Sequence, residues 1–268
     1  MKKILLAVDG DNFPNGAFEF ARKMNEQEPI LLTGVFLPEL DMTSPPHYTS
    51  VFIPLVETYA AASLEKSIAT FKQQCARHDI HFNIHNNLPE LGLPELQKES
   101  RFADLLLLGH EKFYGDLSIY GTNEFLGGVL HQTECPVVVI PEQFSFPESV
   151  ILAYDGSSSA AYAIRSFTYL FPQLCNRRTI LIYSSATAEE MPEVDKIMEL
   201  AGHHFSNLTF QLLSADPKKY FGTWLSEIKN PIVVSGAYGR TGLSRTFKHS
   251  FVYKIMHEYN VPVYIAHR

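Results

Sequence analysis

The chain has 268 residues, of which 46% are hydrophobic and 19% charged, a balance typical of globular proteins with buried cores. Its net charge of -7 at pH 7, without a basic stripe, argues against nucleic-acid binding. No apolar run approaches the roughly 20 residues that span a membrane. Asp9 stands where a signal peptide would still be apolar, so we expect no secretory leader. We therefore expect a cytoplasmic protein with neither nucleic-acid nor membrane partners.

Strand-like and helical segments alternate along the whole chain. The strands are apolar runs without polar alternation, as in parallel strands that are buried on both faces. The expected strands are 3–9, 30–37, 81–86, 104–109, 136–141, 149–154, 179–183, 208–213, 231–235 and 261–266. The expected helices are 14–26, 53–78, 93–101, 123–133, 158–171, 192–205, 217–229 and 250–259. Such alternation predicts an α/β fold in which doubly wound parallel sheets carry helices on both faces.

The second half of the chain repeats the first. Ile-Leu-Leu-Ala-Val-Asp-Gly at 4–10 matches Ile-Leu-Ala-Tyr-Asp-Gly at 151–156. Cys-Pro-Val-Val-Val-Ile at 135–140 likewise matches Val-Pro-Val-Tyr-Ile at 261–265. A repeat of this length is too long for a solenoid and indicates a duplicated domain.

The repeat predicts two Rossmann-like or flavodoxin-like domains, each with a five-stranded parallel sheet. We place the first domain at 1–141, a short polar linker at 142–148 and the second domain at 149–268. The halves differ in charge. Residues 1–147 carry 10 Lys and Arg against 19 Asp and Glu, a net of -9, whereas 148–268 carry 12 against 10, a net of +2.

A glycine-rich loop follows the fourth expected strand of the second domain. Gly236 and Gly239 would let backbone N–H groups approach a ligand closely, and Ser250 is a good N-cap for the helix that begins at Phe251. The N-terminus of a helix suits phosphate. The same loop carries the potential cations Arg240, Arg245, Lys248 and His249. The alternative is a solvated basic loop whose glycines only serve its turns.

Each copy places an acid just after its first strand, at Asp9 and at Asp155. At the carboxyl edge of a doubly wound sheet, an acid can hold a metal that bridges phosphates or hydrogen-bond a ribose. Helix capping by Asp155 or by Ser157 is a further role for these residues. Neither the Walker pattern nor G-x-G-x-x-G occurs in the chain.

The cysteines and histidines give weaker signals. The three widely separated cysteines, Cys75, Cys135 and Cys175, predict buried thiols rather than a disulfide framework or a metal site. The series His78-x2-His81-x3-His85 has the number of ligands that a metal needs, but it spans a helix end and a strand. We expect no acid near His81 or His85, and so interpret this series as surface histidines.

Together these motifs resemble the universal stress protein family over both halves, as a tandem universal stress protein. The nucleotide motif of that family is G-x2-G-x9-G-[S/T]. The second domain reads Gly236-x2-Gly239-x9-His249-Ser250, with His249 in place of the third glycine. Two outcomes stay open at His249: its imidazolium contacts the phosphates or turns away from them, or its ring fills their position.

The first domain departs further from the family motif. It reads Gly109-x2-Lys112, and Gly121 and Thr122 could imitate the final Gly-Ser pair with shifted spacing. The acids around this loop are Glu111, Asp116 and Glu124. Because like charges oppose phosphate binding, Asp9, Gly109, Gly121 and Thr122 are the weaker set of candidates.

The resemblance implies a stress-response protein that binds ATP or AMP, with or without Mg²⁺, mainly in the second domain, and acts as a sensor or regulator. It implies Asp155 near the metal or the ribose, and Tyr183 as the nearest candidate against adenine. The competing function is a scaffold of the same fold that acts through protein contacts. A slow ATP hydrolase is the third alternative, although no dedicated nucleophile or base is evident, so we do not expect an enzyme.

Members of the family commonly dimerise through their last strands. The resemblance therefore implies that 137–140 and 263–266 meet within one chain, which would pack the two domains as an intrachain pseudo-dimer. A homodimer of the tandem chain is left open.

Overall fold

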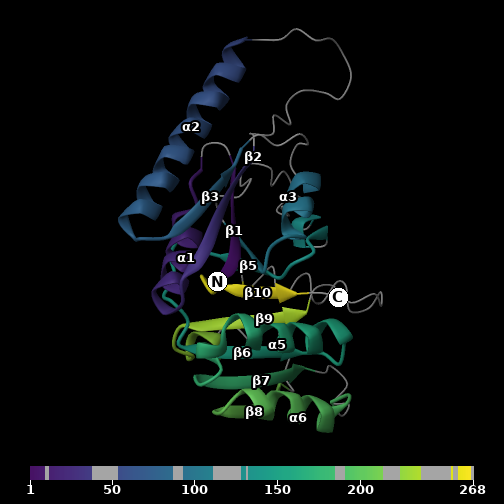
Figure 1. Ribbon diagram of the computed structural model, residues 1–268. Coiled ribbons are helices and arrows are strands. Elements are labelled where there is room, and N and C mark those ends of the chain that lie inside the picture. Colours follow the sequence, from purple (N-terminus) through teal and green to yellow (C-terminus); the bar gives the residue numbers. More distant parts are fainter. Residues whose placement is uncertain are drawn as a thin grey trace. The chain divides into compact units, whose positions relative to one another are not determined.

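The computed structural model describes residues 1–9, 12–37, 54–86, 93–110, 128–130, 132–184, 191–213, 224–236, 255 and 259–266. The chain divides into two compact units, Met1–Cys135 and Pro136–Arg268. The first unit runs from purple to teal in Figure 1, and the second from teal to yellow.

The first unit contains a parallel sheet in the order β3-β2-β1-β4. Its strands are β1 (Lys2–Asp9), β2 (Ile30–Leu37), β3 (His81–His85) and β4 (Leu105–Gly109). Its helices are α1 (Asn15–Gln27), α2 (Pro54–Arg77) and α3 (Leu93–Ser100). β1 pairs with β2 along its full length, from Lys2 opposite Ile30 to Asp9 opposite Leu37. Asp9, the last residue of β1, therefore lies at the carboxyl edge of the sheet.

Aromatic side chains join α2 to the sheet of the first unit. Phe71 of α2 is fully buried and makes edge-to-face contacts with Phe36 of β2 and Phe82 of β3, with ring centroids 5.6 Å apart in both pairs. One turn further along the helix, Cys75 is also fully buried. The spacing of four residues puts both side chains on the helix face that covers the sheet, as the apolar pattern predicts.

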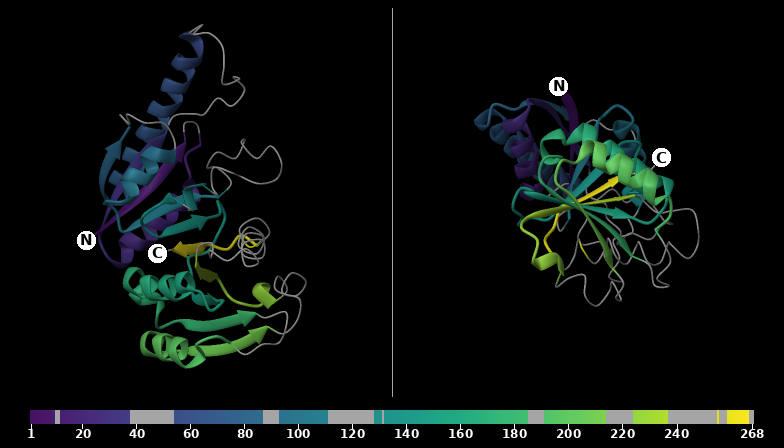
Figure 2. Two further views of the ribbon diagram at one scale, coloured as in Figure 1. Left: turned by 90° about the vertical axis from the view of Figure 1, so that its right-hand side faces the viewer. Right: turned by 90° about the horizontal axis from the view of Figure 1, so that it is seen from below.

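The second unit repeats this architecture. Its parallel strands are β6 (Ser149–Tyr154), β7 (Arg178–Ser184), β8 (Leu208–Leu213), β9 (Pro231–Gly236) and β10 (Val263–Ala266), in the order β10-β9-β6-β7-β8. Its helices are α5 (Ser158–Leu170), a short 3-10 helix η2 (Pro172–Leu174) and α6 (Val194–His204). Figure 2 shows α5 and α6 side by side on one face of this sheet, with the helical turn at 224–226 on the other face.

β5 (Val137–Ile140) belongs to the second unit and pairs with β10 in antiparallel orientation, with Val139 opposite Val263. The expected meeting of these two strands is confirmed. Both strands are completely buried. The α/β class is confirmed as well. β5, which the repeat placed at the end of the first domain, adds an antiparallel strand beside β10 of the second unit.

The helix expected at 217–229 ends earlier than its apolar pattern suggests. Its described part is helical only over 224–226 and then forms tighter turns, in which Glu227 and Ile228 donate to the carbonyls of Trp224 and Leu225. Asn230 follows with a φ of +42°, immediately before Pro231. A left-handed residue followed by a proline, which has no backbone N–H to donate, ends the turn before β9.

Candidate functional site

The turn after β6 carries the acid and the serine that the sequence singled out. Asp155 is exposed at the carboxyl end of β6, Gly156 follows with a φ of +81°, and Ser157 is the N-cap of α5. Ser157 donates its backbone N–H and its hydroxyl to Asp155 Oδ1, at 3.1 and 2.6 Å. Its Oγ also accepts from the N–H of Ala160 at 3.1 Å. The carboxylate is thus fixed at the surface, at the positive end of a helix.

β9 ends next to this turn, at Gly236. β6 and β9 are in register, with Ala153 opposite Ser235, so Gly236 is level with Tyr154. A Cβ on Gly236 would lie 2.4 Å from the backbone nitrogen of Ala160. Glycine is therefore required here for close packing of the strand end on α5, a different reason from the ligand approach that the sequence suggested.

The position of this turn in the sheet is the one where α/β proteins bind ligands. The chain leaves β6 towards β7 and β8 on one side and returns to β9 and β10 on the other. The carboxyl ends of β6 and β9 thus flank a topological switch point, the position at which such sheets generally bind ligands. The structure brings Asp155, Ser157 and Gly236 together there.

Tyr183, the candidate partner of adenine, lies in β7 directly opposite Tyr154 of β6. The two side chains are only 7% and 6% exposed, so each offers a ligand little surface. Burial, helped by the neighbouring carboxylates of Asp155 and Glu193, raises the pKa of Tyr154 above its usual value. Its phenol is therefore neutral at physiological pH and can donate a hydrogen bond.

Several sequence-predicted residues lie outside the described part of the chain. In the second unit these are Gly239, Arg240, His249, Ser250 and Phe251, and in the first unit Gly121 and Thr122. Their roles stay predictions.

A metal at Asp155 would have to share the carboxylate with Ser157, which already donates twice to Oδ1. Within the described residues, no group of three or more His, Cys, Asp and Glu side chains is placed to hold a metal ion. Any metal near Asp155 would therefore depend on oxygen ligands from a bound nucleotide, which is how Mg²⁺ commonly binds in proteins.

The corresponding acid of the first unit has a different environment. Asp9 is the last residue of β1 and is only 6% exposed, and its backbone carbonyl accepts from the N–H of Asn12 at 3.0 Å. The helix that follows has Pro14 at its N-cap, where no side chain caps the first turn. The capped turn of the second unit is thus not repeated here.

Gly109 ends β4 at the same edge of the first unit and is buried. His110 follows it and is only 8% exposed, a buried titratable residue that the sequence reasoning missed. β1 and β4 are in register up to Leu6 opposite Leu107, and continuing that register puts His110 level with Asp9. The sequence feature that could have identified His110 was its position directly after a completely apolar strand.

The histidine series of the first unit needs one correction. We expected no acid near His85, but its Nδ1 lies 2.7 Å from Oε1 of Glu99 on α3. The partner comes from a helix 14 residues along the chain, and the fold brings it to β3. The pair is a local polar contact.

Across the described residues, no helix is long and apolar enough to cross a membrane.

Comparison with known proteins identifies the fold. No family model and no curated protein matches the sequence. Among solved structures, the chain is similar to a universal stress protein from Archaeoglobus fulgidus, with 16% identity and a TM-score of 0.72 over 98% of this chain and 96% of that chain. It is also similar to a functionally unknown protein from Pseudomonas aeruginosa PAO1, with 13% identity and a TM-score of 0.57 over 100% of this chain and 92% of that chain.

The chain is thus an α/β protein with doubly wound, mostly parallel sheets. Over nearly its whole length it has the fold of a universal stress protein.

Proposed function

We propose that this chain is a stress-response protein that binds an adenine nucleotide, ATP or AMP, mainly in its second unit. Binding would change its contacts with partner proteins, so the chain acts as a sensor or regulator. The observation that carries the proposal is the exposed carboxylate of Asp155, which Ser157 fixes at the switch point beside the N-terminus of α5. An oriented acid at this edge is suited to a ribose hydroxyl or to a metal that bridges phosphates.

The charge of the second unit also supports this proposal. Residues 148–268 carry a net charge of +2, against -9 for residues 1–147. Phosphates are attracted to positive charge and repelled by negative charge. The glycine loop adds Arg240 and Lys248 to the half that holds Asp155, whereas Glu111 and Asp116 follow Gly109 in the first half.

Calorimetric titration of ATP and AMP, with and without Mg²⁺, tests the proposal. Asp155→Asn should weaken binding at least about tenfold, because a hydrogen bond to a charged group contributes roughly 1.5–3 kcal/mol. The corresponding variant Asp9→Asn should leave the affinity unchanged. Absence of binding at millimolar concentration would favour the scaffold, which acts through protein contacts alone.

The cations of the loop can be tested separately. Replacing Arg240 and Lys248 together by Gln should weaken binding and flatten its dependence on salt, because both act through charge. Lys229→Gln is the matched control for each single replacement, Arg240→Gln or Lys248→Gln, since Lys229 is an exposed cation of the same unit that pairs with Glu148. An equal loss in the control would show that only the overall charge matters.

His249 decides between two forms of the site. If its imidazolium contacts the phosphates, the affinity should rise as the pH falls below about 6.5, the usual pKa of histidine. If its ring fills the phosphate position, His249→Gly should create binding that the native chain lacks. Titrations of both proteins at pH 6 and pH 8 separate these cases, and absence of binding in both would reject the second-unit site.

A slow ATP hydrolase is the third candidate. The hydroxyl of Ser157 does lie beside the carboxylate of Asp155, but its Oγ also accepts from the N–H of Ala160 as the cap of α5, so we assign the pair to the helix cap rather than to hydrolysis. Phosphate release measured alongside the titrations would detect it.

A further inference from the structure

Exposed apolar side chains gather at one edge of the second unit. β8 is the edge strand of its sheet, at the opposite end from β10. Phe210 and Leu212 of β8 are 44% and 48% exposed, and Val194 at the start of α6 is 42% exposed. These are three of the six exposed large hydrophobic residues in the described part of the chain. Figure 1 shows α6 beside β8. A cluster of this kind is typical of a contact with another protein.

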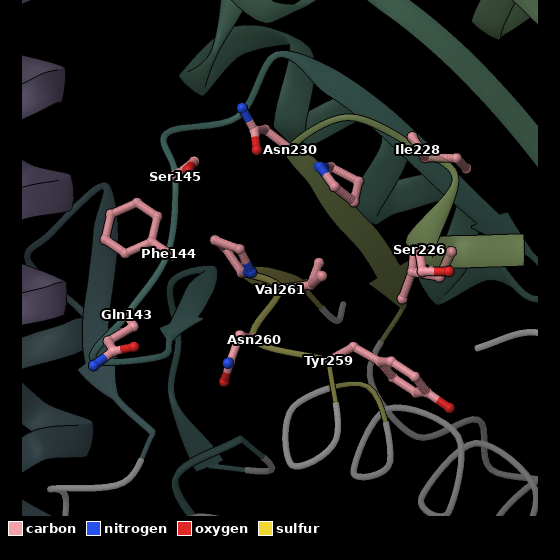
Figure 3. A pocket seen from close by; sticks show the side chains of 12 residues that line it. Gln143, Phe144, Ser145, Ser226, Ile228, Asn230, Tyr259, Asn260 and Val261 are labelled. Carbon is pink, nitrogen blue, oxygen red and sulfur yellow. The ribbon is translucent and has the colours of Figure 1, made fainter. Parts of the chain in front are cut away.

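The apolar residues of β8 lie on the same face of the sheet as α6. On the other face, Trp224 Nε1 donates to Gln211 Oε1 of β8 at 3.0 Å. Figure 3 shows the continuation of the turn that Trp224 begins, from Ser226 to Asn230, beside a hollow of about 440 Å³ before β9. Gln211 therefore belongs to the face of that turn. Because side chains alternate along a strand, Phe210 and Leu212 belong to the face that carries α5 and α6 (Figure 2).

β8 lacks the features that usually prevent an edge strand from pairing with another chain. Such strands commonly carry charged residues or proline. β8 reads Leu-Thr-Phe-Gln-Leu-Leu, without charge, proline or glycine, and β7 is the only described strand that pairs with it. β3, the edge strand of the first unit, differs because it begins and ends with histidine, and His85 pairs with Glu99. The backbone of β8 is therefore suited to accept a further strand.

The sequence of β8 is complementary to itself in antiparallel pairing. Leu208 and Leu212 stand two residues before and two residues after Phe210, so the apolar order is the same in both directions. Two copies of β8 related by a two-fold axis would place Phe210 opposite Phe210 of the partner, and Leu208 opposite Leu212 of the partner. All three pairs lie on the face of α6. Cross-strand pairs of aromatic and aliphatic side chains stabilise such a sheet.

The position of α6 fits the same arrangement. α6 lies over the β7–β8 end of the sheet (Figures 1 and 2). Strands are spaced by about 4.8 Å, so two such helices would be roughly 10 Å apart across the new strand pair, close to the 8–10 Å at which helices pack. The two-fold axis makes them antiparallel. The end of one helix that carries Asp195 would then lie beside the end of the other that carries His203. Opposite side-chain charges and opposite ends of the helix dipoles meet there.

We infer that β8 and α6 form an interface through which two copies of this chain associate about a two-fold axis, joining their second-unit sheets edge to edge. The partner is a second copy because both the apolar order of β8 and the charges at the ends of α6 are complementary to themselves. This contact is distinct from the pairing of β5 with β10 within one chain. It does not depend on nucleotide binding at Asp155.

Sedimentation velocity of the full chain, from micromolar concentration to about 0.1 mM, tests the inference. The native chain should form a dimer of twice the 30.3 kDa of one chain. Phe210→Lys places like charges opposite each other at the axis and should weaken the dimer at least about tenfold, which corresponds to roughly 1.4 kcal/mol. Tyr169→Lys is the matched control, because Tyr169 is an exposed aromatic residue of α5 in the same unit, and should dimerise as the native chain does. A monomeric native chain, or an equal loss in Tyr169→Lys, would overturn the inference.

Mixing two charge variants tests the position of the axis. Phe210→Lys and Phe210→Glu should each be mostly monomeric, whereas their equimolar mixture should dimerise, because a lysine then lies opposite a glutamate across the axis. Recovery in the mixture would also show that both variants are folded. A mixture that stays monomeric would overturn the pairing about Phe210.

Discussion

Asp9 and Asp155 follow the same apolar strand sequence in the two halves of the chain, yet they differ in solvent exposure. Asp9 is buried at the end of β1, whereas Asp155 is exposed and accepts two hydrogen bonds from Ser157. The helix after Asp155 has a side-chain cap, and the helix after Asp9 has none. A repeated motif therefore does not imply a repeated site, because the segments that surround each acid decide whether a ligand can reach it.

The largest expected effect concerns Gly236, which ends β9 in the second unit. Gly236→Ala should destabilise the protein by about 1–3 kcal/mol, because the new Cβ would lie 2.4 Å from the backbone of Ala160. Gly202→Ala is the control: it lies in α6 with no atom within 4 Å of the new Cβ, and should be stabilising by up to about 1 kcal/mol. Urea denaturation measures both, and a neutral Gly236→Ala would contradict the packing argument.

Exchanging each acid for alanine tests the comparison directly. Asp9→Ala should cost about 1–3 kcal/mol, because it removes a buried side chain at the end of β1 and leaves a cavity there. Asp155→Ala should cost less, because the groups released from an exposed carboxylate can bind water instead. Thermal unfolding of the two variants gives the ranking. A larger loss for Asp155 would show that its role in the fold exceeds that of Asp9.

The helix cap of the second copy should contribute less. Ser157→Ala removes the bond to the N–H of Ala160 and should cost about 1 kcal/mol. Ser158→Ala, at the next, exposed position, should be close to neutral. Chemical denaturation checks both. A similar loss in the two variants would argue against a specific cap.

The thiols provide the smallest effect at neutral pH. Burial raises the pKa of Cys75 and Cys135 to about 12 and that of Cys175 to about 11. A raised pKa means that the folded state favours the neutral thiol, so this stability is fully present below the ordinary pKa of about 9 and is lost as the pH rises towards 11–12. Stability measured from pH 8 to pH 10.5 should fall more steeply for the native chain than for Cys75→Ala, relative to each protein's value at pH 8. Parallel curves would contradict the burial of this thiol.

The apolar runs were sufficient to predict most strands and helices. The strands at 30–37, 149–154 and 208–213 have the predicted ends, and α2 differs from its prediction by one residue at each end. Strands that are buried on both faces require continuous apolar sequence, and a surface helix requires a periodic apolar face, so both leave local signals. The repeated motifs supported the family resemblance, and that resemblance predicted the pairing of β5 with β10.

The sequence by itself therefore determined the α/β class, the duplicated strand and helix order, and the candidate acids and glycines of the second copy. Only the tertiary structure decided that Asp9 is buried while Asp155 is exposed, that Gly236 is needed for packing on α5, and that Glu99 reaches His85. These outcomes depend on which distant segments meet at a strand end. The local sequence shows the hydrophobic period of a helix or a strand. The exposure and the partners of a side chain, in contrast, depend on segments that lie far along the chain.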